Sequence, residues 1–192
     1  MIDKATVDLL TKLSLTMFRK NFFGIYHGAI SSKLDQNHFL INTSDAIFDE
    51  MTEKSFCTLN MNKKDYRWNM ASIESHIHQT IYSNIHEAKY IAFGMPIYTT
   101  AYTFEHDNIQ FEDFFGKTTF GNLKVYDPGD FSTWYQRNAL EVTKYLKESS
   151  NNVMIVKGVG TYVYDRDVHQ LVKKIAILEN SCRLLSIKAS FD

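Results

Sequence analysis

The most regular hydrophobic pattern of the chain lies between residues 71 and 96. Isoleucines recur at every fourth position: Ile73, Ile77, Ile81 and Ile85. Polar or amphipathic side chains recur one position later: Glu74, His78, Tyr82 and His86. Both spacings are helical, so they predict an apolar face and a neighbouring polar stripe on one helix, with Ser72 as a candidate N-cap. The apolar segment 90–96 that follows contains Gly94 and Pro96 and predicts a short buried strand.

The rest of the chain alternates between helical and strand patterns. Amphipathic helices are predicted over residues 3–20, from Ser132 or Thr133 to about Lys147 through Leu140, and from a cap at Asp167 to Leu185. Strands are predicted over residues 24–34, 38–42, 56–60, 123–126, 153–156 and 161–164. Residues 97–104 fit either a strand or a helix, and residues 111–115 fit a helical turn. This order predicts an α/β fold, with a central mixed sheet covered by helices on both faces.

Composition and charge narrow the functional classes. A chain of 192 residues with 44% hydrophobic residues is long enough for one domain with a sizeable core, and we expect a single domain over residues 1–192. The net charge of -1 indicates no nucleic-acid partner. Apolar runs fall short of the roughly 20 residues of a membrane span. The first residues lack a signal-peptide layout, and Cys57 and Cys182 are expected to be reduced thiols, so we expect a cytoplasmic protein without a membrane partner.

One motif resembles a known family. Ser72-x-Glu74 followed by His78, Tyr82 and an acidic-Ala turn at Glu87-Ala88 is similar to the core motif of the class II aldolase/adducin family. The resemblance spans roughly residues 5 to 187. It implies a three-layer α/β/α fold with a mixed, largely antiparallel sheet. It also implies a homo-oligomer, because the family's enzymes are tetramers with sites between subunits.

The resemblance extends to three loops that bind the substrate phosphate in the family's enzymes. They correspond here to residues 28–31, 42–45 and 72–74, and they make five residues candidates for ligand binding: Gly28, Ser31, Thr43, Ser44 and Ser72. Each loop departs from the family pattern, at Ala29, Asp45 and Ile73. A carboxylate at Asp45 would cost about 1 to 4 kcal/mol beside a phosphate. We therefore expect a small polar metabolite without a phosphate.

The largest departure concerns the metal. In the family's enzymes the residue at Glu74 is the acid/base, and three histidines bind zinc. Matching the motifs without a gap puts Phe93, Met95 and Val159 at those histidine positions. A catalytic zinc site needs three nitrogen, oxygen or thiolate ligands, which these side chains do not supply. We therefore expect no cofactor, with zinc or another divalent metal only at a site outside the family pattern.

The candidates for such a different metal site are Glu74 and His78, which have helical ligand spacing. The simpler interpretation is that His78 is a hydrogen-bonded structural histidine, that His76 and His86 are exposed, and that Glu74 is a buried carboxylate bonded to backbone or to a tyrosine. Cys57 or Cys182 as a nucleophile would need a histidine partner that spacing does not reveal.

Together these features predict an aldolase-fold protein with a degenerate metal site, which acts by binding or assembly as adducin does. The alternative is a divergent lyase of the aldolase or epimerase type. It would act on a small sugar or polyol through Glu74 and a shifted metal site. A ligand-binding module for an unphosphorylated metabolite is a third hypothesis.

Overall fold

The fold is organised around one eight-stranded sheet, which a computed structural model describes within residues 4–191. The strand order is β3-β2-β1-β4-β8-β7-β6-β5. The strands are β1 Ala29–Lys33, β2 His38–Asn42, β3 Phe56–Asn60, β4 Tyr90–Gly94, β5 Asn108–Gln110, β6 Asn122–Tyr126, β7 Val153–Val156 and β8 Gly160–Asp165. Neighbouring strands pair antiparallel except β6 and β7, which are parallel. The predicted mixed, largely antiparallel sheet is therefore confirmed.

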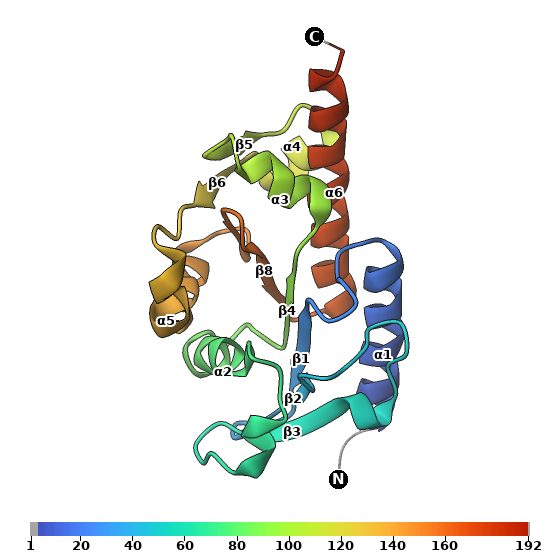
Figure 1. The fold of residues 1–192 in the computed structure, drawn as a ribbon, viewed down its shortest axis with the longest axis vertical. Helices are drawn as coiled ribbons and strands as arrows, with labels where there is room; N and C mark the ends of the chain where they lie inside the picture. The colour runs from blue at the N-terminus through green and yellow to red at the C-terminus, as the bar shows by residue number, and fades with distance from the viewer. Residues whose placement is uncertain (1–3, 192) are drawn as a thin grey trace.

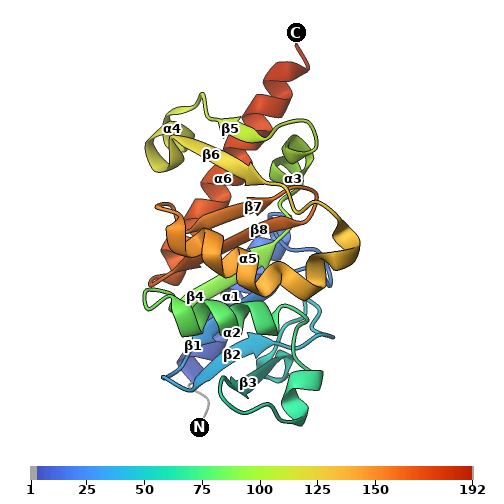
Figure 2. The same cartoon turned by 90° about the vertical axis from the view of Figure 1, so that its left-hand side faces the viewer.

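Helices cover both faces of this sheet, which confirms the predicted three-layer α/β/α fold. The helices are α1 Lys4–Arg19, α2 Ser75–Asn84, α3 Ile97–Thr103, α4 Phe114–Phe120, α5 Trp134–Glu148 and α6 Val168–Ala189. Short 3-10 helices lie at Glu53–Ser55, Tyr66–Asn69 and Phe131–Thr133. In Figures 1 and 2, α1 and α6 lie on one side of the sheet and α2 and α5 on the other. Within residues 4–191, no helix has the length and apolarity needed to cross a bilayer.

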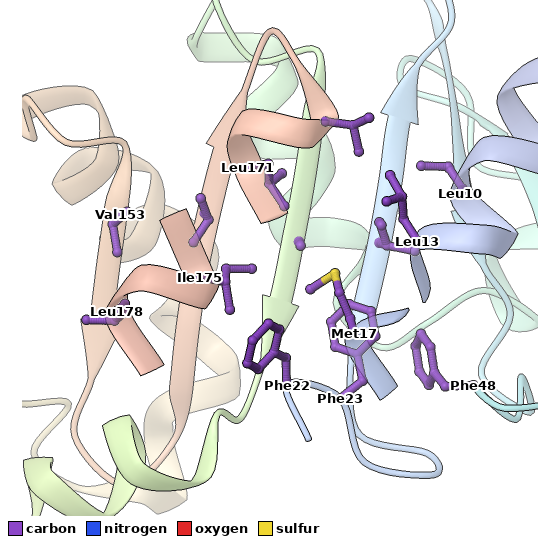
Figure 3. Close-up of a cluster of buried hydrophobic side chains, with 14 of the residues drawn as sticks. Leu10, Leu13, Met17, Phe22, Phe23, Phe48, Val153, Leu171, Ile175 and Leu178 are labelled. Carbon is purple, nitrogen blue, oxygen red and sulfur yellow. The ribbon is translucent and has the colours of Figure 1, made fainter. Parts of the chain in front are cut away.

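Each face of the sheet has its own hydrophobic core. On one face, α1 contributes Leu10, Leu13 and Met17, and α6 contributes Leu171 and Ile175, all pointing toward the strands (Figure 3). On the other face, Ile77 and Ile81 of α2 pack with Val142 and Leu146 of α5 and with Tyr162 of β8. Burying one such aliphatic side chain stabilises the fold by about 1.5–3 kcal/mol. The second core packs α2 against the face of the sheet onto which the Tyr162 side chain of β8 projects.

Several element boundaries follow the sequence pattern and others do not. Strands β2 and β3 have the predicted bounds, and Asp167 caps α6 by accepting a hydrogen bond from the His169 N–H at 2.7 Å. Residues 97–104, left open between strand and helix, contain α3. The predicted strand over residues 24–34 is wrong in its first half. The Gly24 N–H donates to the His27 carbonyl at 2.8 Å, which folds residues 24–28 into a loop.

Two helix faces also differ from the prediction. Ile73 is 56% exposed because it precedes α2, which begins at Ser75 with Glu74 at the N-cap. Ser72 is therefore not the N-cap; its backbone N–H bonds the Asn42 carbonyl and so ties this segment to β2. In α5, Leu140 is 72% exposed, whereas Asn138 and Thr143 are buried. The polar stripe predicted on α2 is buried at Glu74, His78 and Tyr82, because it faces the sheet.

A buried carboxylate fixes the connection that follows β4. Glu179 of α6 accepts hydrogen bonds from the Tyr98 N–H at 2.9 Å and from the Thr99 N–H and hydroxyl, both at 2.8 Å. Amide groups in the first turn of a helix have no partner within the helix, and a carboxylate satisfies them well. Glu179 therefore holds the start of α3 against α6 from about 80 residues away in the sequence.

Candidate functional site

Glu74 is a buried carboxyl group that lies at the start of α2 and is only 7% exposed. Burial raises the pKa of its carboxyl from 4.5 to about 7, against a hydrogen bond from Tyr162 that lowers it. The Tyr162 hydroxyl donates to Glu74 Oε2 at 2.8 Å. The interpretation of Glu74 as a buried carboxylate bonded to a tyrosine is therefore confirmed, and the tyrosine comes from β8.

Glu74 lies in the wall of a cavity of about 220 Å³. The structure brings five of the six candidate site residues to this cavity: Gly28, Thr43, Ser44, Ser72 and Glu74. They come from the end of the loop before β1, from the segment after β2, and from the segment that leads into α2. Their convergence gives the cavity one polar wall with a single carboxylate.

Asn42, the last residue of β2, also lines the cavity and holds its polar wall in place. Its side-chain Oδ1 accepts from the Ile30 N–H at 2.9 Å, and its Nδ2 donates to the Thr43 carbonyl at 3.1 Å. Ser72 contributes its hydroxyl, which accepts from the Glu74 N–H at 3.3 Å. These bonds join β1, β2 and the approach to α2, so the hydroxyl groups of the wall have fixed positions.

Another part of the cavity lining is apolar. Phe93, Met95 and Val159 line the same cavity as Glu74. The Phe93 and Tyr162 rings pack with their centroids 4.5 Å apart. These are the three positions that the family resemblance gives to zinc-binding histidines. They present a phenyl ring, a thioether and an isopropyl group.

This donor set does not fit the family's zinc ion. Besides Glu74 itself, the described lining offers the imidazole of the exposed His27 and the thioether of Met95, which suits copper(I) rather than zinc; its other polar groups are uncharged hydroxyls, an amide and an indole, which are not typical zinc ligands. Within residues 4–191, no group of three or more His, Cys, Asp or Glu side chains is arranged to hold a metal ion.

The sixth candidate, Ser31, lies apart from the described lining of the cavity. Its hydroxyl is 2.7 Å from His78 Nδ1 and 2.7 Å from the Tyr82 hydroxyl, within the core. Burial lowers the pKa of His78 to about 3, so its imidazole is neutral. His78 is thus buried and hydrogen-bonded, as the simpler interpretation expects, and it is not among the described residues that line the cavity.

The other two histidines of this region differ from each other. His86 is exposed as predicted. His76 is partly buried and its Nε2 lies 3.1 Å from the Asn138 Oδ1 of α5, so the prediction that it is exposed was wrong. The contact arises because α2 and α5 pack side by side on the sheet (Figure 2).

The sequence motifs did not point to the aromatic side chains of the site. Tyr26, Trp134 and Tyr135 line the cavity, and Tyr162 is hydrogen-bonded to Glu74 in its wall. The sequence does carry a signal for Tyr162. Side chains alternate along β8, so Tyr162 lies on the same side of the strand as Gly160, the residue that follows Val159. The sequence does not reveal that this side faces the start of α2.

A larger hollow, of about 810 Å³, lies at the β3 edge of the sheet, and Glu74 is not among its described lining residues. Its basic side chains already have partners: Arg67 forms an ion pair with Asp65 at 2.6 Å, and the Lys89 ammonium donates to the Lys33 carbonyl. The hollow also contains Cys57, and burial raises the pKa of that thiol to about 11. Burial likewise raises the pKa of Cys182 to about 12. Both thiols are protonated at neutral pH, which is unfavourable for a nucleophile.

Comparison with known proteins gives the same family as the motifs. The family model described as "Class II Aldolase and Adducin N-terminal domain" matches residues 8–186 of the chain. Among curated proteins, no sequence matches it.

Solved structures share the fold at low sequence identity. L-fuculose-1-phosphate aldolase from Thermus thermophilus superposes with a TM-score of 0.84 at 17% identity, covering 96% of this chain and 94% of that one. A sugar-phosphate aldolase from Thermotoga maritima gives 0.76 at 14% identity, with coverages of 98% and 96%. The N-terminal class II aldolase domain of a Thermoplasma acidophilum protein gives 0.69 at 12% identity, with coverages of 96% and 95%. At these identities the likeness shows the fold alone.

Proposed function

Because this chain belongs to the class II aldolase and adducin N-terminal domain family, we propose that it keeps the family's fold and acts by binding or assembly. In this proposal it lacks the family's zinc-dependent sugar-phosphate aldolase activity. The observation that carries the proposal is the apolar wall of the cavity, where Phe93, Met95 and Val159 face the space next to Glu74. Changing even an outer partner of a metal ligand typically costs 10 to 100-fold in affinity or activity. Replacing three ligands together removes the site.

The proposed ligand is a small polar metabolite without a phosphate group. The polar wall retains hydroxyl groups at Thr43, Ser44 and Ser72, which suit hydrogen bonding to a small polar ligand. Of the described residues that line the cavity, none is Lys or Arg. A phosphate would therefore meet the Glu74 carboxylate without a compensating cation, which is unfavourable in a buried site.

We also propose that the protein forms a homo-oligomer in the cytoplasm. Apolar side chains are exposed around the mouth of the cavity, among them Ile25, Tyr26 and Ile73. Exposed apolar patches of this kind often mark protein interfaces. The unpaired, buried thiols of Cys57 and Cys182 support a reducing compartment.

One observation favours a second function, a divergent lyase acting on a small sugar or polyol. Glu74 has a pKa of about 7, which is the range in which a carboxyl works best as a general acid or base at neutral pH. Such an enzyme would keep Glu74 as the proton-transfer group. Any metal it used would need donors other than the three apolar side chains.

Metal analysis of the protein purified without chelators tests the proposal. We expect zinc well below one equivalent and no aldehyde release from L-fuculose 1-phosphate. Stoichiometric zinc that is lost in Glu74→Ala or His78→Ala, together with aldol cleavage, would refute it. A thermal-shift screen with polyols and their phosphates tests the binding role, since a ligand at 100 times its Kd stabilises the fold by about 2.7 kcal/mol.

A further inference from the structure

The charge of the cavity lining is unbalanced. Glu74 supplies a carboxylate, and no described lining residue is Lys or Arg; the one basic side chain of the described lining is the exposed His27. The remaining lining groups are hydroxyls, an amide, a thioether, hydrocarbon and aromatic rings. A cation is therefore the ionic ligand that this lining complements.

The carboxylate also has room for another partner. Tyr162 donates to Oε2 of Glu74 at 2.8 Å. Within residues 4–191, no group donates a hydrogen bond to Oε1, the second oxygen. A buried carboxylate gains most from a partner that brings both opposite charge and N–H donors. An ammonium group offers both, whereas an alcohol offers only the donor.

Aromatic rings from three separate elements line the same space. Tyr26 comes from the loop before β1, Phe93 from β4, and Trp134 and Tyr135 from the first turn of α5. The faces of aromatic rings carry partial negative charge and attract cations. The Trp134 ring already has the Arg137 guanidinium over it, 5.4 Å from the centroid, so Tyr26, Phe93 and Tyr135 are the rings open to a cation of the ligand. Rings gathered around one carboxylate form a typical environment for an alkylammonium group.

We propose that the ligand of this cavity is a small organic amine in its ammonium form. Its N–H groups bind Glu74 Oε1, and its carbon chain lies against Phe93, Trp134 and Tyr135. The volume of about 220 Å³ is below the roughly 300–1,000 Å³ of pockets for drug-sized ligands, so the amine has only a few carbon atoms. This inference rests on the proposed binding function and names the ligand class.

Three probes of equal length test the proposal: n-butylamine, 1-butanol and butyrate. Calorimetric titration at pH 8, above the pKa of Glu74, measures the affinity of each for the full chain. We expect n-butylamine to bind at least 10-fold tighter than 1-butanol, and butyrate to bind more weakly than either. In Glu74→Gln the amine should lose this advantage, while the affinity for 1-butanol should change less than 2-fold.

Two further variants separate a specific site from general attraction. Asp45→Asn removes an exposed carboxylate next to Ser44 that does not line the cavity, and it should keep the preference for the amine. Tyr135→Leu removes an exposed ring from the lining. It should weaken n-butylamine binding about 2 to 5-fold, the equivalent of an exposed cation–π contact. Circular dichroism of each variant checks that it is folded.

The outcomes distinguish a failure of the amine assignment from a failure of the proposed binding function on which it rests. Equal binding of n-butylamine and 1-butanol to the wild type overturns the inference, and so does a preference for the amine that survives Glu74→Gln or disappears in Asp45→Asn. If glycerol or erythritol stabilises the protein and n-butylamine does not, the binding function stands and the amine assignment falls. Stoichiometric zinc with aldol cleavage refutes the binding function itself.

Discussion

Glu74→Gln should leave the stability of the protein nearly unchanged at pH 4.5 and raise it at pH 8. Burial raises the pKa of Glu74 from 4.5 to about 7 in the folded state. Below pH 4.5 the folded and unfolded chains both hold the proton. Between pH 4.5 and 7 only the folded chain holds it, so the free energy of unfolding falls as the pH rises. One pKa unit corresponds to about 1.4 kcal/mol, so the wild type should lose about 3 kcal/mol by pH 8.

The glutamine variant has no such loss, because its amide stays neutral and its oxygen can still accept the hydrogen bond from Tyr162. Urea denaturation at half-unit steps from pH 4.5 to 8, at constant ionic strength, measures the difference between the two proteins. Asp45→Asn, which neutralises an exposed carboxylate, is the control. If the difference in unfolding free energy between Glu74→Gln and the wild type stayed constant over this pH range, Glu74 would ionise as easily as an exposed carboxyl. That result would refute a raised pKa of Glu74.

Three further substitutions test other parts of the structure. Gly160→Ala should destabilise by about 3 kcal/mol in urea denaturation, because its Cβ would lie 2.5 Å from the Gly94 carbonyl oxygen at a φ of +146°; a loss below 1 kcal/mol would contradict this contact. Glu179→Gln should cost about 1–3 kcal/mol, since its NH2 group would face a backbone N–H of α3 that then lacks an acceptor, and amide hydrogen exchange should become faster at Tyr98 and Thr99. For His78, whose pKa burial lowers to about 3, stability is lost as the pH falls below 6.5. His78→Gln should therefore gain about 3 kcal/mol relative to the wild type between pH 6.5 and 4, whatever its stability at neutral pH. Parallel urea curves over that range would exclude a neutral buried imidazole.

The sequence predicts the regular parts of the fold well, because local chemistry determines them. Strands β2 and β3 alternate or run apolar between polar connections, and α6 has both a capping Asp167 and a long periodic face. The error at residues 24–28 has a tertiary cause. The alternation of Ile25 and His27 resembles a strand, but the Ile25 carbonyl accepts from the Phe48 N–H, which holds this segment as a loop at the cavity mouth.

The lining of the cavity is only partly predictable from the sequence, because it also depends on tertiary contacts. Spacing alone reveals Glu74 at the head of a helix, and the resemblance adds the loops at Gly28, Thr43 and Ser72. The Tyr162 hydroxyl reaches Glu74 across 88 positions of the sequence. Which face of β8 meets α2 depends on the order of strands in the sheet. No local pattern carries that information, and the same holds for the rings of Tyr26 and Trp134.

The carboxylate of Glu179 has a consequence for how this protein could change over evolution. Met95 lies in the cavity wall, on the short segment between β4 and α3. That segment leads directly into the first turn of α3, which Glu179 holds by hydrogen bonds. Substitutions deep in the last helix can thus reposition a side chain of the cavity wall without any change among the residues that line the cavity. Efforts to redirect what this protein recognises should therefore randomise position 179 together with the cavity, since the shape of the wall is partly encoded there.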